Sequence, residues 1–307
     1  MMHVRNLKAG INISGYAALW FLSGQIFAST QLSVAQPSRD PAELVRTVVQ
    51  NEVKASTNSA EPLFFSGTKT TPRGSTTKLY VETSEATAGM VIAYNGTPLT
   101  PEQRRGEQAR LERFVKDPEE LRKKKAQERE DAARTMRIVR ALPDAFLYEY
   151  DGQEMGTEGV GKPGEPLVRL KFRPNPNYDP PTRVEEVLRG MQGYVLVDAA
   201  HERMASIDGT LFRDVGFGWG ILGHLDKGGR FVVHQQAVDG KLWAISSMSL
   251  KFTGRILLVR SLAIDSTEVF SGYKRVASNL TFAQGLELLA KEEAGAGAAV
   301  QADRARR

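Results

Sequence analysis

The sequence contains no cysteine and only four histidines among its 307 residues. The lack of cysteine excludes disulfides, thiolate metal ligands, a cysteine nucleophile and a lipid anchor attached to an N-terminal cysteine. The few histidines are scattered, and no two of them have the H-E-x-x-H spacing of a zinc protease. We therefore expect neither a metal site nor a cofactor.

The chain also lacks a dense block of one charge that could serve a polyanionic partner. Its 41 Lys and Arg residues are nearly balanced by 36 Asp and Glu residues, which leaves a net charge of +5. No cluster of basic residues is interleaved with aromatic residues, as it is on nucleic-acid-binding surfaces. A nucleic-acid partner is therefore not expected.

Long apolar stretches are lacking except near the N-terminus. Residues 1–35 contain Arg5 and Lys8 but no acidic residue, an apolar stretch covers 11–28, and Ser33-Val34-Ala35 supplies small residues for signal peptidase. This order predicts a cleaved secretory signal over 1–35, and a cysteine-free exported chain fits the bacterial periplasm. The alternative is an uncleaved anchor, although the stretch is short for the ~20 apolar residues that span a bilayer. After cleavage we do not expect an integral membrane protein.

Three segments begin with the same helix-capping pattern. Asp40-Pro41, Thr100-Pro101 and Asp117-Pro118 each place a capping side chain before a proline at the first helical position, with Glu or Gln at the third. They predict helices over about 40–54, 101–115 and 118–141, the last of which ends before Pro143. The first helix carries one apolar stripe that must pack against another element: Leu44, Val45, Val48, Val49 and Val53.

The segment 101–141 is densely charged and has few apolar residues. It contains Arg122-Lys123-Lys124-Lys125 and then Glu128-Arg129-Glu130-Asp131. This composition predicts a charged helical insertion that is solvated on most sides and adds little to stability. The alternative is an arm that contacts a partner or an anionic membrane surface.

The rest of the chain indicates an antiparallel meander, because strand-like runs follow one another with short turns such as Asn95-Gly96, Asp208-Gly209 and Thr253-Gly254. We predict an α+β fold with one sheet of about ten to twelve strands, in a single domain over 36–290, and a disordered tail over 291–307. The expected strands cover about 63–70, 77–83, 89–94, 145–150, 167–173, 193–199, 202–208, 211–221, 230–238, 241–252, 255–264 and 267–276.

The order of these elements resembles that of the LolA/LolB-like superfamily of bacterial periplasmic lipoprotein carriers. The capped helix at Asp40-Pro41 follows an export signal and precedes early strands, a helical segment and a late meander. In the meander, Gly193-Tyr194-Val195-Leu196-Val197-Asp198 leads to Arg203-Met204-Ala205-Ser206-Ile207-Asp208-Gly209, similar to a strand–turn–strand of that family. The resemblance covers about 40–276 and extends to exported bacterial proteins of the same layout. It implies an incomplete, strongly curved barrel whose apolar concave face is covered by helices and holds acyl chains.

Two late strand-like runs supply the residues that we expect to line such a groove. Alternation places their apolar side chains on one face, although the pattern does not decide which face is concave. If the helix over 40–54 covers this face only loosely, the gap accepts an acyl chain. The predicted groove residues are Leu242, Met248, Leu250, Phe252, Ile256, Leu258, Leu262 and Ile264.

No motif indicates a catalytic site. Residues 218–223 match G-x-G-x-x-G, but a strand rather than a helix is expected next, so a nucleotide site is disfavoured. His201, His224 and His234 are expected to be structural or solvent-facing, and Asp198 is expected to face Arg203 across a turn. The sequence does not exclude a catalytic Ser-His-Asp triad, because the members of a triad need not be adjacent in sequence.

These observations predict a non-enzymatic periplasmic protein that binds a lipid or the acyl chain of a lipoprotein. The alternative is an interaction module of the cell envelope, with the same fold and a groove filled by its own side chains, which would bind an envelope protein. A hydrolase is a third and weaker possibility.

Overall fold

A computed structural model describes residues 39–57, 61–217, 223–239, 242–256 and 260–306. The expected signal segment, residues 1–35, lies outside these ranges. Contacts group the chain from Pro37 to Arg307 into one unit, and everything below concerns that unit.

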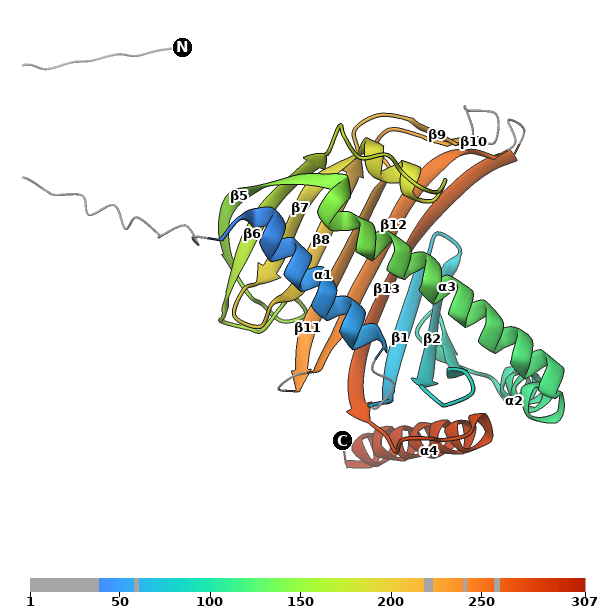
Figure 1. Cartoon of the computed structure of the whole chain (residues 1–307). Coiled ribbons are helices and arrows are strands. Elements are labelled where there is room, and N and C mark those ends of the chain that lie inside the picture. The colour runs from blue at the N-terminus through green and yellow to red at the C-terminus, as the bar shows by residue number, and fades with distance from the viewer. Residues whose placement is uncertain (1–38, 58–60, 218–222, 240–241, 257–259, 307) are drawn as a thin grey trace, which may run out of the picture. The chain divides into compact units, whose positions relative to one another are not determined.

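The described strands form one antiparallel sheet, as the sequence predicts (Figure 1). Eleven strands follow one another in the order β4-β3-β2-β1-β13-β12-β11-β8-β7-β6-β5, and the short strands β9 and β10 extend β12 at one end. The edge strands β4 and β5 do not pair with each other, so the sheet is not closed. The bounds are β1 Leu63–Thr71, β2 Gly74–Val81, β3 Ala88–Tyr94, β4 Thr97–Pro98, β5 Phe146–Met155, β6 Pro166–Pro174, β7 Met191–Asp198, β8 Arg203–Leu211, β9 Val215–Phe217, β10 Gly223–Leu225, β11 Arg230–Asp239, β12 Leu242–Ile256 and β13 Arg260–Arg275.

The strand boundaries differ from the prediction at two expected turns. The expected turn at Asp208-Gly209 is wrong, because β8 continues to Leu211 and both residues pair with β11. The expected turn at Thr253-Gly254 is also wrong, because β12 continues to Ile256 and Gly254 pairs with Leu262 of β13. The two runs expected over 255–264 and 267–276 are one strand, β13. Glycine resembled a turn residue here, but Gly254 lies where the backbone of β10 approaches, and a Cβ would come within 2.1 Å of the His224 carbonyl oxygen.

The turn at Asn95-Gly96 forms as predicted. Both residues have positive φ angles, 50° and 74°, which is the conformation that a two-residue hairpin turn requires. The Asn95 side chain also accepts a hydrogen bond from the Ser75 N–H at 2.7 Å, which ties the turn to the neighbouring hairpin.

Helix α1 (Pro41–Thr57) packs on the face of the sheet that carries the main core, which we call the inner face, and covers one half of it. The Asp40 carboxylate caps it by accepting hydrogen bonds from the N–H groups of Ala42 and Glu43. Its predicted apolar stripe is buried against side chains of β5 to β8 in the main core, which contains Leu44, Val45, Val48, Val49, Val168, Leu170, Phe172, Val195, Val197, Met204 and Ile207.

Helices α2 (Pro101–Lys116) and α3 (Pro118–Ala145) connect the two edges of the sheet, because α2 follows β4 and α3 precedes β5. Eleven strands span about 48 Å, and the 28 residues of α3 span about 42 Å. Figure 1 shows α3 running across the sheet beside α1. The segment predicted as an insertion is therefore the crossing that links opposite edges.

The two ends of α3 have different surroundings. Its first half is mostly exposed and carries ion pairs, among them the exposed Arg122–Glu119 and the partly buried Lys124–Glu128, as its composition predicts. Its last turns enter the core, where Ala141, Leu142 and Ala145 are buried, so the expectation that 101–141 is mostly solvated is wrong for its end. The helix also continues through Pro143, so its expected end before this proline is wrong. The proline removes one N–H from the helical hydrogen bonds, and burial of Ala141, Leu142 and Ala145 in the main core offsets that loss.

A second core lies on the outer face of β1 to β3. Helix α4 (Phe282–Arg306) packs there through Phe282 and Leu289, together with Leu111 of α2. The α4 backbone is helical over most of 291–307, where the sequence predicted a disordered tail. Among the described helices, none combines the length and the apolar character needed to cross a bilayer.

The contrast along α3 gives a first prediction. Leu142 is 4% exposed and packs in the main core, so Leu142→Ala is expected to lower the free energy of unfolding by about 2–5 kcal/mol. Arg122 is exposed on the same helix, so Arg122→Ala is expected to leave stability nearly unchanged. Urea unfolding of both variants measures this, and an equal effect at the two positions would contradict the division of α3.

Candidate functional site: an apolar groove under the helices

A groove with a cavity volume of about 1750 Å³ lies between the sheet and the helices α1 and α3. The volume is larger than the ~300–1,000 Å³ of ordinary small-molecule sites. Its floor comes from β1 and from β11 to β13, and its opposite wall comes from the end of α1 and from residues 135–142 of α3. The groove adjoins the main core, because three side chains line the groove and also pack against that core: Phe231, Val233 and Phe252.

The structure brings most of the predicted groove residues together in this lining. Six of the eight line the groove, from both β12 and β13: Leu242, Met248, Leu250, Phe252, Leu262 and Ile264. Leu258 and the side chain of Ile256 lie outside the described part of the chain. Ligand binding by these residues stays a prediction.

Sequence reasoning missed the aromatic part of the floor. Phe65 of β1 stacks on Tyr273 of β13 with ring centroids 5.3 Å apart, and it meets Phe270 edge to face at 6.0 Å. All three rings line the groove. The neighbouring Phe64 points to the α4 side, so the pair Phe64-Phe65 supplies one ring to each face of the strand. That alternation was visible in the sequence, but the pairing of β1 with the distant β13 was not.

It also missed the part of the lid that α3 supplies. Met136, Ile138, Val139 and Leu142 line the groove at helical spacing. The Ser56 hydroxyl, which donates to the Val53 carbonyl at 2.8 Å, lies 3.2 Å from the Met136 sulfur, so the end of α1 contacts this part of α3. The dense charge on the rest of α3 obscured this short apolar stripe.

An ion pair fixes the end of α1 on the sheet at the groove wall. The Glu52 carboxylate accepts from Arg203 at two atoms, Nε at 2.9 Å and Nη2 at 3.1 Å, and from the Met204 N–H at 3.1 Å. The two side chains are only 12% and 13% exposed. Such a bidentate pair orients both partners, and it determines where α1 ends over β8.

A second carboxyl in the lining, that of Glu82, has a different environment. Glu82 follows β2 and accepts a hydrogen bond from the Leu63 N–H at 3.0 Å, while its own N–H donates to the Leu63 carbonyl. Burial raises the pKa of Glu82, and the Leu63 N–H only partly opposes this shift. No ion pair joins Glu82 to another described residue.

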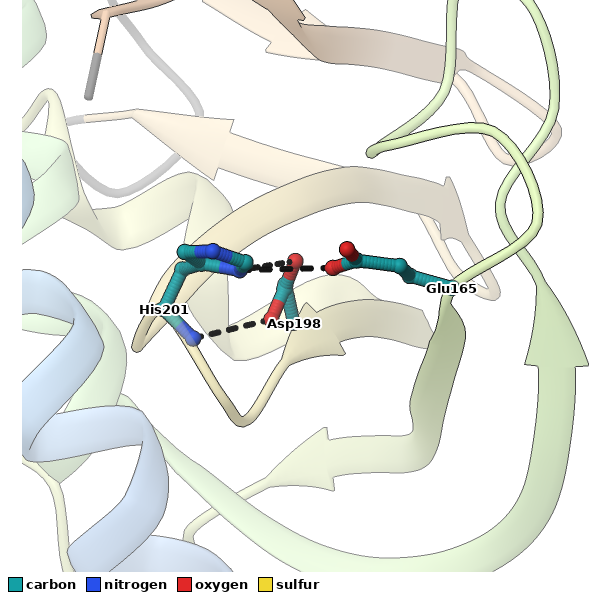
Figure 2. Close-up of side chains that lie close together, drawn as sticks. All are labelled: Glu165, Asp198 and His201. Carbon is teal, nitrogen blue, oxygen red and sulfur yellow. Dashed lines mark hydrogen bonds and ion pairs between the residues drawn. The ribbon is translucent and has the colours of Figure 1, made fainter. Parts of the chain in front are cut away.

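The turn between β7 and β8 contains a compact polar cluster, shown in Figure 2. Asp198, 1% exposed, accepts from the His201 N–H and approaches His201 Nδ1, both at 2.9 Å, and Glu165 lies 3.6 Å from the same nitrogen. The three side chains lie close enough together to bind one metal ion. Their contacts with one another already explain their positions, because these contacts stabilise the turn.

One expectation about this turn is revised, and the expected structural role of His234 agrees with its contacts. Asp198 and Arg203 are register partners, as expected, but their side chains bond to His201 and Glu52 instead of each other. His234 bonds to Ser206 within the sheet, and burial lowers its pKa. The glycine motif 218–223 lies outside the described residues except for Gly223, which is in β10.

Comparisons with known proteins add little to this geometry. No family model matches the chain, and no curated protein matches its sequence. Among solved structures, a DUF1329 family protein from Desulfovibrio piger is similar at 8% identity, covering 79% of this chain and 96% of that one, with a TM-score of 0.26. The likeness is distant, and no conclusion about function rests on it.

The Glu52–Arg203 pair gives a second prediction. Arg203→Met leaves the largely buried Glu52 charge unpaired, so it is expected to lower the free energy of unfolding by about 3 kcal/mol. Adding Glu52→Gln removes that charge and should restore part of the loss. A double-mutant cycle by urea unfolding measures the coupling, and fully additive losses would contradict the role assigned to the pair.

The shifted carboxyl of Glu82 gives a third prediction. A raised folded-state pKa means that ionising Glu82 destabilises the fold above that pKa, and that this penalty vanishes below the unfolded value of about 4.3. Glu82→Gln is therefore expected to be more stable than the parent near pH 7.5, with a difference that shrinks toward pH 4. Urea unfolding of both proteins at the two pH values tests this, and a pH-independent difference would contradict it.

Proposed function

We propose that this protein is a non-enzymatic binding protein that holds a lipid, or the acyl chain of a lipoprotein, in the groove under α1 and α3. The observation that carries the proposal is the large cavity with a mostly apolar lining beside the main core. Such a lining favours long hydrocarbon chains, because each buried CH₂ contributes ~0.8 kcal/mol. A chain of about 14 carbons then gains on the order of 10 kcal/mol before the costs of ordering it.

The proposal includes export to the periplasm and membership of the LolA/LolB-like superfamily. Both rest on the sequence: on the signal-like segment 1–35 and on the order of helix, early strands, helical segment and meander. The open antiparallel sheet with helices on its inner face is compatible with that resemblance. In this function the protein shields an apolar chain from water, and no residue needs to act as an acid, base or nucleophile.

The alternative is an envelope interaction module whose groove is filled by its own side chains. The cavity of about 1750 Å³ favours the open form, because a filled groove would leave little space between α3 and the sheet. Ile245 and Ile264, which line the groove, are also 39% and 38% exposed, as expected if part of this surface awaits an apolar ligand.

The proposal predicts that the purified protein carries or takes up lipid. Organic extraction followed by mass spectrometry should find bound lipid, and the protein should bind a fluorescent fatty-chain probe. Met248→Asp places a carboxylate in the lining, so it is expected to weaken probe binding at least about tenfold.

Ser249→Asp is the matched control, because it adds the same charge on the same strand at a position that faces away from the groove and bonds to Thr267. It should bind the probe like the parent. Circular dichroism should show that both variants keep their secondary structure. A parent protein that yields no lipid and binds no probe would favour the interaction module.

A further inference from the structure

Three carboxylates line the groove, and two of them have a basic partner. Glu52 pairs with Arg203 at 2.9 Å, and Glu61 pairs with Arg275 at 3.0 Å. Glu82 has only the hydrogen bond from the Leu63 N–H among its contacts with described residues. One oxygen of this partly buried carboxyl, Oε1, therefore has capacity for a further donor at the edge of an apolar space.

Glu82 lies beside the aromatic floor of the groove. Burial, and then the nearby charge of Glu82, raise the pKa of Tyr273, so the two side chains share one environment. The Tyr273 hydroxyl donates to the Ile245 carbonyl, so Tyr273 does not supply Glu82 with a donor. Three other residues of the loop that contains Glu82 line the groove. Thr83 and Ser84 donate to backbone carbonyls, and no hydrogen bond joins Thr87 to Glu82.

The basic residues of the described lining do not offset Glu82. Arg203 is occupied by Glu52. His224 and Arg255 belong to the opposite end of the groove, where Arg255 pairs in register with Ser261 of β13. Tyr273 is 12 residues farther along the same strand, which is about 40 Å at the rise of a β-strand. One end of the apolar groove thus presents an uncompensated hydrogen-bond acceptor.

We propose that Glu82 binds the polar end of the ligand, and that this end is a hydrogen-bond donor, best a protonated amine on a long hydrocarbon chain. This inference rests on the proposed apolar-ligand function and narrows it. An ammonium group forms a charge-assisted hydrogen bond with the free carboxylate oxygen, and a hydroxyl forms a weaker one. A carboxylate head would be repelled by the like charge, so the same site disfavours fatty acids.

The test compares three ligands that share one chain and differ only in the head: hexadecylamine, hexadecanol and hexadecanoate. Each displaces a neutral fluorescent probe from the full chain at about pH 7.5 and below the concentration at which the ligand aggregates. The amine is expected to act at about tenfold lower concentration than hexadecanoate, with the alcohol between them. In Glu82→Gln this preference for the amine should largely disappear.

Glu85→Gln is the matched control, with the same change of charge three residues away. Glu85 accepts a hydrogen bond from the Phe282 N–H on the α4 side and does not line the groove. It should keep the parent's preference. A loss of preference in Glu85→Gln equal to that in Glu82→Gln would overturn the assignment to Glu82.

The parent's ligand order tests the inference without any variant, so it stays falsifiable if Glu82→Gln does not fold. Equal displacement by the three ligands, or tightest binding of hexadecanoate, would overturn the recognition by Glu82 and leave the apolar groove standing. No binding of the probe and no effect of any ligand would overturn the proposed function itself, and this inference with it.

Discussion

The rest of the structure depends on one connection, the crossing from edge strand β4 to edge strand β5. Because these strands end opposite sides of an eleven-strand sheet, the chain between them must span the sheet. A single long helix does this with most of its backbone hydrogen bonds satisfied internally, which an extended loop over an apolar face could not do. The crossing also explains why α3 is charged where it leaves the sheet and apolar where it passes over the groove.

The helices cover the two faces of the sheet unequally. On the inner face, α1 and the end of α3 bury the side chains of β5 to β8. On the outer face, α4 and Leu111 bury those of β1 to β3. The inner faces of β1, β12 and β13 are left with aromatic and aliphatic side chains under a helix that touches them only in part. Apolar surface left this way is unfavourable in water, and a ligand that displaces the water gains free energy from covering it.

Three acidic side chains in the lining illustrate how local partners divide structural from recognition roles. Glu52 is satisfied by a bidentate arginine and a backbone N–H, so it serves to fix α1. Glu61 is exposed and paired with Arg275, so this ion pair contributes little to the stability of the fold. Glu82 keeps a free oxygen in a partly desolvated position, which makes it the acid most available to a ligand.

The sequence by itself determined the local features of this protein. Capping residues placed the starts of α1, α2 and α3, Asn95-Gly96 placed a turn, and alternation identified Leu242, Met248, Leu250, Phe252, Leu262 and Ile264 as one apolar face. Thr281 and Gln284 form a capping box of the same kind at the start of α4, a helix that was not among those predicted. These features depend on neighbours within a few residues, so short-range patterns suffice to predict them.

Only the tertiary structure decided which distant segments meet. The pairing of β1 with β13, the crossing of α3 and the contact of Glu52 with Arg203 join residues that are far apart in the chain. Periodicity specifies that a face is apolar but not what covers it. It could not place Phe65 beside Tyr273, nor show that Glu82 has no basic partner among the described residues. The groove exists because helices that cover half of the inner face cannot also cover the rest, and that limit is set by the arrangement of the elements in space.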